Sequence, residues 1–587
     1  MAQGREAVHS LADQVAAVVT AALPAEAAGA DPVVRRSEHA DFQSNVALPL
    51  AKRLGRTPRV IAEEISGRLR DEVIAAGELS GPGFVNITLT DSAIWAQVAA
   101  RLSADRLGVG APLAGQRVVL DYSSPNIAKQ MHVGHLRTTI IGDALARVLA
   151  FLGAQVIRQN HLGDWGTQFG MLIQFIDEHP ELEWRHDDLA DPAEATIDAL
   201  DALYRRARAE FDTDAEFADR ARARVVALQA EDPATLRVWA DLVAESQRAF
   251  QALYDRLGVL LTPEDSAGES TYNAYLDEVT AELAHAGIAV PSEGALCVFF
   301  DEFAGPDGTP VPLIVRKSDG GYGYAATDLA TIRHRIRKLE ATRILYVVDA
   351  RQARHFEMVF ATARRAGWLG DDVHAVHVPF GTVLGPDGKP FKTRSGSTIP
   401  LSELLDSAVR RAGEILVEKA PGLDRNTLDQ VAAAVGIGSV KYADLSGSRI
   451  KDYVFDVDRM VSFAGDTGAY LQYAHARIRS ILRNVADEPV PGVDSTVPLE
   501  PAERALGLQL DEFGRAVADV AQTLEPHRLA GYLYALAQAF TAFYEACPVL
   551  GAEDPAVRGN RIALCRLTGD TVAQGLELLG IAAPERI

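Results

Sequence analysis

The sequence predicts an α/β protein: a Rossmann-type parallel sheet with a helical insertion, an N-terminal α+β domain and a C-terminal all-α helical bundle. Three observations predict this fold class. Residues 118–162 read as strand, loop, helix and strand, the repeating unit of a parallel sheet. Residues 191–257 are rich in Ala, Arg, Glu and Leu and poor in Gly, which favours long helices. Residues 421–587 read as helical throughout.

Residues 1–112 form the predicted N-terminal domain. Its first helix is amphipathic rather than a secretion signal, because four apolar residues share one helical face: Val8, Leu11, Val15 and Val18. Residues 46–54 and 58–69 read as two further helices, and residues 80–89 read as a turn that leads into a strand. The Pro- and Gly-containing segment 111–115 is the predicted linker to the next domain.

The predicted sheet domain spans residues 116–400 and carries the helical insertion at about 175–300. Residues 401–455 form a helical connection, and residues 456–587 form the C-terminal bundle. After the insertion the sheet pattern resumes, with strands predicted at residues 311–315, 322–325, 343–349 and 373–380.

Composition narrows the class of protein. The chain has 587 residues, 48% of them hydrophobic, and a net charge of −22, which argues against a surface coated in positive charge for nonspecific nucleic-acid binding. The acidic balance does not exclude a local basic stripe. The spacing of Cys297, Cys547 and Cys565 fits neither a zinc site nor a disulfide framework, so a reducing cytoplasm is expected. No apolar run is long enough to cross a membrane, and we expect a monomer.

The loop after the first predicted strand contains His-Val-Gly-His at residues 132–135, named here the signature turn. Ligands bind where parallel strands end, and a helix N-terminus favours phosphate. Gly134 permits close backbone approach, and His132, His135 and Lys129 supply donors and positive charge. This context favours nucleotide chemistry. Two histidines that merely cap a helix are the alternative; zinc is less favoured, because the metalloprotease motif spaces its histidines four apart.

The wider segment, residues 123–137, reads Ser-Ser-Pro-Asn-Ile-Ala-Lys-Gln-Met-His-Val-Gly-His-Leu-Arg. It resembles the signature of arginyl-tRNA synthetases, which are class I aminoacyl-tRNA synthetases; Val133 replaces the Ile of the class pattern. The resemblance extends through residues 158–170 and covers most of the chain. It implies that ATP activates L-arginine to arginyl-adenylate, and that the arginyl group passes to the terminal adenosine of an arginine-accepting tRNA. Mg²⁺ is expected on the phosphates rather than in a protein metal site.

Residues 385–396 are glycine-rich and basic, and are named here the basic loop. They resemble the Lys-Met-Ser-Lys-Ser loop that holds the pyrophosphate of ATP in this class. The match is degenerate, since Lys392 is followed by Arg394 where the pattern has a second lysine. Lys129 is placed to supply the missing charge, and a plain flexible hairpin is the alternative. The resemblance implies ATP binding by His132, Gly134, His135, Lys392 and Arg394, with catalytic roles for His132, His135, Lys129 and Lys392.

A site for arginine must bind a planar guanidinium and reject lysine. Carboxylates placed for forked hydrogen bonds achieve this, because an ammonium lacks the paired donors. Asp121 ends the first strand and Asp328 lies near a helix start, so both are consistent with this role; the alternative for Asp328 is a helix N-cap. The resemblance implies an arginine-binding set of Asp121, Asn126, His132, Tyr324, Asp328 and Gln352, and Ser123, which lies beside them in the loop, is expected to join it.

Two regions resemble tRNA-binding parts of the same family. The N-terminal domain resembles the one that contacts the tRNA elbow, where Phe84 can stack on a base and Asn86 can read its edge. The alternative is that Phe84 is core and Asn86 caps a turn. The C-terminal bundle resembles the anticodon-binding domain, and Tyr470, Tyr473 and Arg477 combine stacking faces with a phosphate donor.

Three other functions compete with this prediction. A small-molecule nucleotidyltransferase would share the signature turn but would not need the two terminal domains. A non-catalytic tRNA-binding paralogue should have lost Lys129 or one signature histidine, and all three are present. Another class I synthetase is disfavoured by the set of Tyr324, Asp328 and Gln352 and by the Ser-x-Asn prefix.

Overall fold

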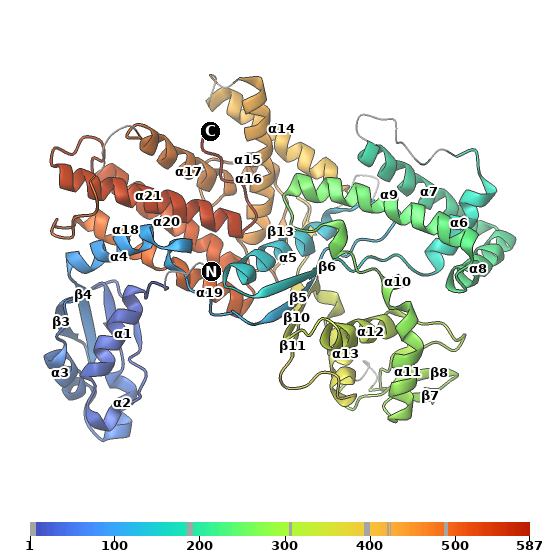
Figure 1. The fold of residues 1–587 in the computed structure, drawn as a ribbon, viewed down its shortest axis with the longest axis horizontal. Coiled ribbons are helices and arrows are strands. Elements are labelled where there is room, and N and C mark those ends of the chain that lie inside the picture. Colours follow the sequence, from blue (N-terminus) through green and yellow to red (C-terminus); the bar gives the residue numbers. More distant parts are fainter. Residues whose placement is uncertain are drawn as a thin grey trace, which may run out of the picture.

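The computed structural model describes residues 7–182, 184, 192–303, 308–391, 399–419, 422, 424–486 and 491–587. At its centre lies a parallel four-stranded sheet in the order β11-β10-β5-β6 (Figure 1). Its strands are β5 (Arg117–Asp121), β6 (Gln155–Gln159), β10 (Arg343–Asp349) and β11 (His374–Phe380). The predicted strands 343–349 and 373–380 are therefore confirmed, and so is the fold class.

Strand β5 lies inside the sheet, with a paired strand on each side. Because both faces of a parallel sheet are covered, its residues are apolar on both faces. Val118 and Leu120 join the core on one face, which also contains helix α5 (Val133–Phe151). Val119 joins the core on the other face, under α12 (Tyr324–Arg337) and α13 (Ala353–Arg365). Because β5 and β10 are parallel, the loops that follow them leave from the same edge of the sheet.

Two predicted strands of this sheet are wrong. Residues 322–325 form no strand, because α12 already begins at Tyr324 with Gly323 as its N-cap. Residues 311–315 do contain a strand, β9 (Leu313–Arg316), but it belongs to a separate antiparallel sheet with β7 (Val290–Ser292) and β8 (Ala295–Val298). Its residues alternate between buried and exposed, as in a sheet with one solvated face.

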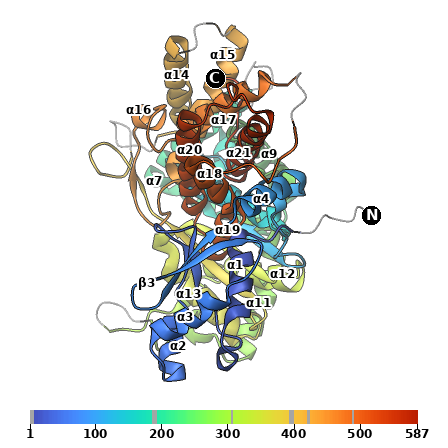
Figure 2. The same ribbon diagram turned by 90° about the vertical axis from the view of Figure 1, so that its left-hand side faces the viewer.

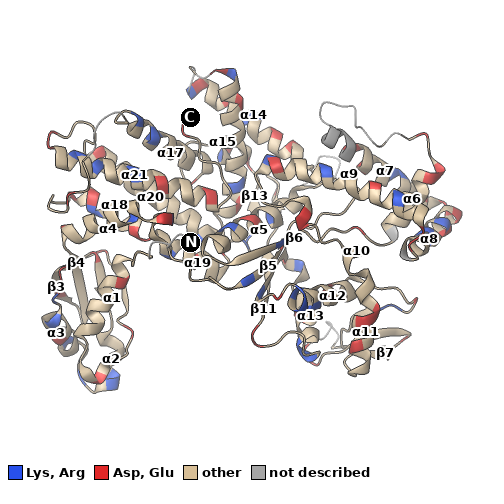
Figure 3. Ribbon diagram, in the orientation of Figure 1, with Lys and Arg blue, Asp and Glu red and all other residues tan. Residues whose placement is uncertain are grey.

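The insertion between β6 and β10 is mainly helical. Its long helices project to one side of the sheet (Figure 1): α6 (Thr167–Glu178), α7 (Pro192–Thr213), α8 (Ala215–Gln229) and α9 (Pro233–Leu257). The short α10 (Glu269–Tyr272) and α11 (Leu276–His285) lead back toward the antiparallel sheet. Acidic and basic side chains are interleaved along α8 (Figure 3), and one of its arginines, Arg220, pairs with Glu178 at the end of α6 at 2.6 Å. Such mixed charge is typical of a solvated face.

The N-terminal domain is an antiparallel sheet packed against helices on one face (Figure 2). The sheet order is β1-β2-β4-β3, with β1 (Val34–Arg36), β2 (Phe42–Ser44), β3 (Ile74–Ser80) and β4 (Phe84–Leu89). Its helices are α1 (Leu11–Ala22), α2 (Ala47–Leu54) and α3 (Pro58–Arg68), close to the predicted spans.

The C-terminal half is a helical bundle with one exception. Its helices are α14 (Leu401–Lys419), α15 (Arg425–Leu445), α16 (Val457–Met460), α17 (Gly468–Arg483), α18 (Pro501–Asp511), α19 (Phe513–Thr523), α20 (His527–Ala546) and α21 (Pro555–Leu578). The prediction of helix throughout is wrong at β13 (Tyr453–Val454), which pairs with β12 (Val383–Leu384). No helix of the described ranges is long and apolar enough to span a membrane.

Helix α4 (Asp91–Ser103) joins the N-terminal domain to this bundle by packing against α18 and α21. Its Arg101 forms a buried ion pair with Asp511 at 2.6 Å. The same carboxylate accepts hydrogen bonds from the backbone N–H of Leu11, at 2.7 Å, and from Gln97, at 2.6 Å. One buried acid therefore fixes two helices of the N-terminal region to α18.

We predict that Asp511→Ala lowers the free energy of unfolding by about 3–5 kcal/mol, because it leaves the Arg101 guanidinium buried and unpaired. Urea unfolding followed by circular dichroism measures the change. The matched control is Glu414→Ala, which removes the exposed pair between Arg411 and Glu414 and should leave the unfolding curve unchanged. Equal effects of the two substitutions would contradict the prediction.

Candidate active site

The signature turn begins helix α5 through a reciprocal cap made by its two histidines. His132 is the N-cap residue, and its Nδ1 accepts the backbone N–H of Gly134 at 3.0 Å. The Nδ1 of His135 accepts the backbone N–H of His132 at 3.2 Å. In a neutral imidazole an accepting Nδ1 leaves the proton on Nε2. Both rings therefore keep an Nε2–H donor in addition to the capping bond, so the capping alternative and a phosphate-binding role are compatible.

Both histidines are held in the neutral state. Burial and the nearby positive charge of Lys129 lower the pKa of His132. Burial, followed by the neighbouring His132, lowers the pKa of His135 to about 3. The rings lie 4.1 Å apart between centroids. At neutral pH the site thus offers two uncharged N–H donors beside the positive end of the α5 dipole.

The loop between β5 and the signature turn has an unusual backbone. Ser123, Ser124 and Ala128 all have positive φ values, of 74°, 50° and 58°. Such conformations are strained for residues with a Cβ and concentrate at functional sites. Asn126, which is exposed, lies against Gly163, where a Cβ would come within 2.4 Å of the Asn126 Oδ1. Only glycine at position 163 lets the two segments approach in this way.

Two predicted arginine contacts are engaged within the protein itself. Asp121 is buried and forms an ion pair with the fully buried Arg335 of α12, with 2.6 Å between Oδ2 and Nη2. Ser123 is buried, and its hydroxyl lies 2.7 Å from that of Tyr254. These contacts give the polar atoms of Asp121 and Ser123 partners within the protein, and a direct contact of either residue with arginine stays a prediction. They account for both residues as supports of the loop and of α12.

The other predicted arginine residues cluster at α12 and α13. Asp328 lies in the second turn of α12, and its Oδ2 is 2.6 Å from Nε2 of His355. The N-cap alternative for Asp328 is excluded, since the cap residue is Gly323. Tyr324 is 76% exposed at the first residue of α12, and Gln352 is exposed immediately before α13. These side chains leave from the edge of the sheet at which β5 and β10 end.

Sequence reasoning missed one residue of this cluster, Glu269, at the start of α10. Burial, followed by the negative charges of Asp164 and Asp328, raises its pKa to about 8. Gly268 makes the arrangement possible, because a Cβ there would meet the Asp164 carboxylate at 2.1 Å. No sequence signal marked Glu269, which is 59 residues from Asp328 in the chain. A half-buried acid with a raised pKa beside a second acid is a site suited to a cationic ligand.

The segment just after the basic loop lies beside the signature turn, whereas the described start of the loop lies beside β12. Val133 donates its backbone N–H to Ile399 at 3.3 Å, and Leu401 donates to Met131 at 2.9 Å. At the other end, Phe391 donates to Val383 at 3.1 Å. Lys392 and Arg394 themselves lie outside the described residues. Lys129 lies over the ring of Tyr204 in α7, with 4.3 Å between Nζ and the ring centroid.

The predicted tRNA contacts lie on the two terminal domains. Phe84 and Asn86 are half-buried on the outward-facing side of β4, and Asn86 accepts a hydrogen bond from Gln43 at 2.8 Å. In α17, Tyr473 is 44% exposed. Tyr470 meets the ring of Tyr534 edge-on, and Arg477 lies over the ring of Tyr544. None of these contacts removes the residues from the surface, and the proposed RNA contacts stay predictions.

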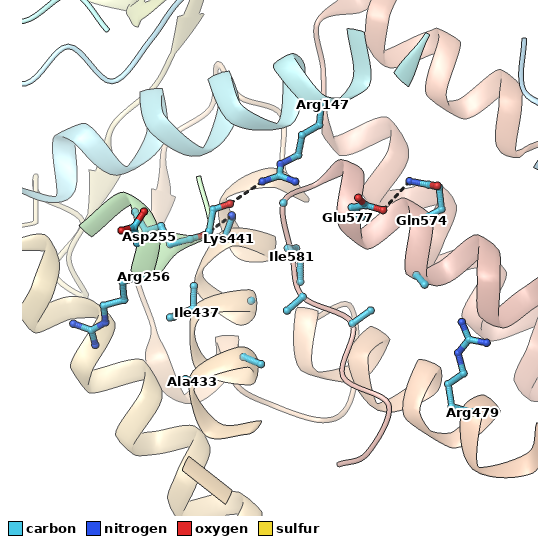
Figure 4. Close-up of a pocket in the computed structure, with 18 of the residues that line it drawn as sticks. Arg147, Asp255, Arg256, Ala433, Ile437, Lys441, Arg479, Gln574, Glu577 and Ile581 are labelled. Atoms are coloured by element: carbon cyan, nitrogen blue, oxygen red, sulfur yellow. Dashed lines mark hydrogen bonds between the residues drawn. The ribbon is translucent and has the colours of Figure 1, made fainter. Parts of the chain in front are cut away.

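A cavity of about 660 Å³ lies elsewhere, at the junction of α5, α9, α15, α17 and α21 (Figure 4). Its lining includes Arg147, Lys441 and Glu577. Arg147 is 12 residues along α5 from His135, which corresponds to about 18 Å of helix. The cavity is therefore separate from the signature turn. Within the described ranges, no three His, Cys, Asp or Glu side chains come together in a group that could hold a metal ion.

Comparison with known proteins agrees with this geometry. Residues 97–457 match the catalytic domain of class I (R) tRNA synthetases, so the sheet, turn and loop define a class I aminoacyl-tRNA synthetase. Residues 9–89 match the arginyl-tRNA synthetase N-terminal domain, and residues 471–587 match the DALR anticodon-binding domain. The chain belongs to the arginyl-tRNA synthetase family.

Relatives named arginine–tRNA ligase match it end to end. The Frankia casuarinae protein is 63% identical, over 99% of this chain and 100% of the relative. The Streptomyces avermitilis protein is 53% identical over the full length of both. Among solved structures, the arginyl-tRNA synthetase of Plasmodium falciparum has a TM-score of 0.82 at 28% identity, covering 99% and 100% of the two chains. That of Thermus thermophilus has a TM-score of 0.78 at 26% identity, covering 98% and 100%.

Proposed function

We propose that this chain joins L-arginine to the 3′-terminal adenosine of an arginine-accepting tRNA, with arginyl-adenylate as the intermediate. One observation carries the proposal beyond the family match. The strained loop places two neutral histidine donors at the edge of the sheet where α12 presents Asp328. Nucleotide-binding and cation-binding groups are thus combined at one edge, as the activation of arginine by ATP requires.

In the first step, an oxygen of the arginine carboxylate attacks the α-phosphorus of ATP. The bond from that phosphorus to the bridging oxygen of the β-phosphate breaks, and pyrophosphate leaves. The Nε2–H groups of His132 and His135, the Gly134 backbone and Lys129 stabilise the charge that develops at the α-phosphate. Lys392 and Arg394 hold the departing pyrophosphate, and Mg²⁺ would bind to the phosphates of ATP and offset their charge.

In the second step, the ribose hydroxyl of the terminal adenosine attacks the carbonyl carbon of arginyl-adenylate, first at the 2′ position as the class implies. The bond to the phosphate oxygen breaks, and AMP leaves. No covalent intermediate forms on the protein. The family resemblance also implies that the first step waits for bound tRNA.

Selection of arginine depends on two acids, Asp328 of α12 and Glu269 of α10. Asp328 and Glu269 accept the guanidinium, with Tyr324 and Gln352 beside them, because two acceptors can satisfy paired N–H donors that the ammonium of lysine does not have. Asn126 and His132 hold the main-chain groups of the amino acid. The engaged carboxylate of Asp121 supports this site through Arg335.

The terminal domains bind the tRNA. Phe84 and Asn86 contact its elbow by stacking and by hydrogen bonds to a base edge. Tyr470, Tyr473 and Arg477 bind the anticodon loop, where unstacked bases need aromatic faces and phosphates need donors. We further propose that the protein acts as a monomer in the cytoplasm.

Pyrophosphate exchange with a panel of amino acids, run with and without total tRNA, tests the function. We expect signal with arginine only when tRNA is present. Signal with a different amino acid but none with arginine would overturn the assignment. Exchange that ignores tRNA and accepts a small-molecule substrate would favour the nucleotidyltransferase alternative.

We predict that Asp328→Asn raises the KM for arginine more than tenfold in the same assay. A charge-assisted hydrogen bond contributes roughly 1.5–3 kcal/mol, and the amide cannot replace it. The KM for ATP should change little. Glu357→Gln, which alters an exposed acid on α13 near His355, is the matched control and should leave both constants unchanged. An unchanged arginine KM in Asp328→Asn would exclude this carboxylate from the site.

We predict that arginine binding releases a proton near pH 7.5. The Glu269 pKa of about 8 leaves most of these carboxyls protonated at that pH, and a bound guanidinium favours the ionised form. Arginine affinity should therefore rise with pH up to about 8 and then level off. Calorimetry in buffers of different ionisation enthalpy counts the protons. Glu269→Gln should abolish the release, Glu264→Gln should keep it, and binding without proton release in the unaltered protein would refute the role.

A further inference from the structure

Three consecutive residues of the loop between β5 and the signature turn contact the helical insertion. The backbone N–H of Ala128 donates to Ser246 of α9 at 3.0 Å, and Gln130 donates to Asp198 of α7. Between them, the Lys129 ammonium lies 4.3 Å from the centroid of the Tyr204 ring. The insertion therefore contacts this loop on both sides of Lys129.

The kind of partner matters for what Lys129 can do. A lysine side chain has four rotatable bonds, so an ammonium that approaches a phosphate must be held in place at an entropic cost. A carboxylate partner would neutralise it and compete with the phosphate. An aromatic face attracts the ammonium but leaves its charge uncompensated. Among side chains that the structure describes, no carboxylate pairs with Lys129, and its charge acts on His132 and His135.

Tyr204 is well placed to hold the lysine. It lies in α7 (Pro192–Thr213), and its ring is half-buried against the main hydrophobic core. A half-buried ring has few available rotamers, so the face it presents is fixed before ATP arrives. The distance of 4.3 Å is well inside the 6 Å range of cation–π attraction.

We propose that Tyr204 is a positioning residue for adenylate formation: its ring holds the Lys129 ammonium beside the signature turn without neutralising it, so that the charge faces the α-phosphate. The inference rests on the proposed function, because Lys129 acts there on ATP. It also gives the insertion a part in catalysis, since α7 supplies the ring.

Substitutions that separate the ring from its bulk test the proposal. In tRNA-dependent pyrophosphate exchange, Tyr204→Leu should lower kcat roughly 2- to 30-fold, the range expected for losing a cation–π contact, with the KM for arginine unchanged. Tyr204→Phe keeps the aromatic face and should keep the activity. Phe211→Leu is the matched control, because Phe211 lies on the same helix and stacks with Arg208 instead.

A double-mutant cycle shows whether Tyr204 acts through Lys129. In a Lys129→Met background, Tyr204→Leu should cause no further loss. The proposal is overturned if Tyr204→Leu retains full kcat, if Tyr204→Phe loses as much as Tyr204→Leu, or if the loss persists undiminished in the Lys129→Met background. Full activity of Lys129→Met would also overturn it, because the lysine would then have no role to support.

A spectroscopic measurement distinguishes this failure from failure of the proposed function. In protein labelled with ¹³Cε-lysine, the Lys129 signal, assigned by its absence in Lys129→Met, should be shifted upfield by the ring in the unaltered protein and in Tyr204→Phe. It should move toward the position of exposed lysines in Tyr204→Leu. An unshifted signal in the unaltered protein overturns the contact itself, even if no amino acid is activated.

Discussion

The site depends on the reciprocal cap between His132 and His135. A helix N-terminus leaves backbone N–H groups without partners, and most proteins satisfy them with Ser, Thr, Asp or Asn. Here imidazole nitrogens take that role, through Nδ1 in both residues. One interaction therefore starts the helix, selects the tautomer and leaves the Nε2–H groups as donors. A Ser or Thr cap would also keep a donor, but on the same oxygen that accepts the backbone N–H, whereas an imidazole carries its donor on a second ring nitrogen.

Buried polar contacts stabilise the loop that precedes this turn. The Asp121–Arg335 ion pair links the end of β5 to α12, so the segment that leads to the nucleotide site and the helix that carries Asp328 share one contact. The hydroxyl contact of Ser123 with Tyr254 links the same loop to α9 of the insertion. Because an unpaired buried charge is costly, these contacts restrict the loop to one arrangement despite its positive φ values.

Much of this was predictable from the sequence. The strands at 343–349 and 373–380 were found because buried strands are continuous apolar runs, and the family was found because the signature segment is specific. The strand predicted at 322–325 was wrong because four residues carry too little pattern to distinguish a strand from the first turn of α12. The strand near 311–315 was assigned to the wrong sheet, since an apolar run does not reveal its pairing partner.

The side-chain partners were not predictable in the same way. Asp121 and Arg335 are 214 residues apart, and Glu269 approaches Asp328 only because α10 and α12 pack together. An acid that contacts the substrate and an acid that holds a protein arginine look alike in a sequence. The fold alone decides between them, through burial and through the partner that comes within reach.

The attachment of α4 to the bundle has a consequence for the distance between the two surfaces proposed to bind tRNA. Asp511 of α18 binds Leu11, Gln97 and Arg101. These buried polar contacts fix the position of the N-terminal domain relative to the C-terminal bundle. The surface proposed for the elbow of the nucleic acid and the surface proposed for its anticodon loop are then separated by a constant span. A tRNA with a shortened or lengthened anticodon arm would contact one of these surfaces but not the other. The protein would then select its tRNA by length as well as by base identity.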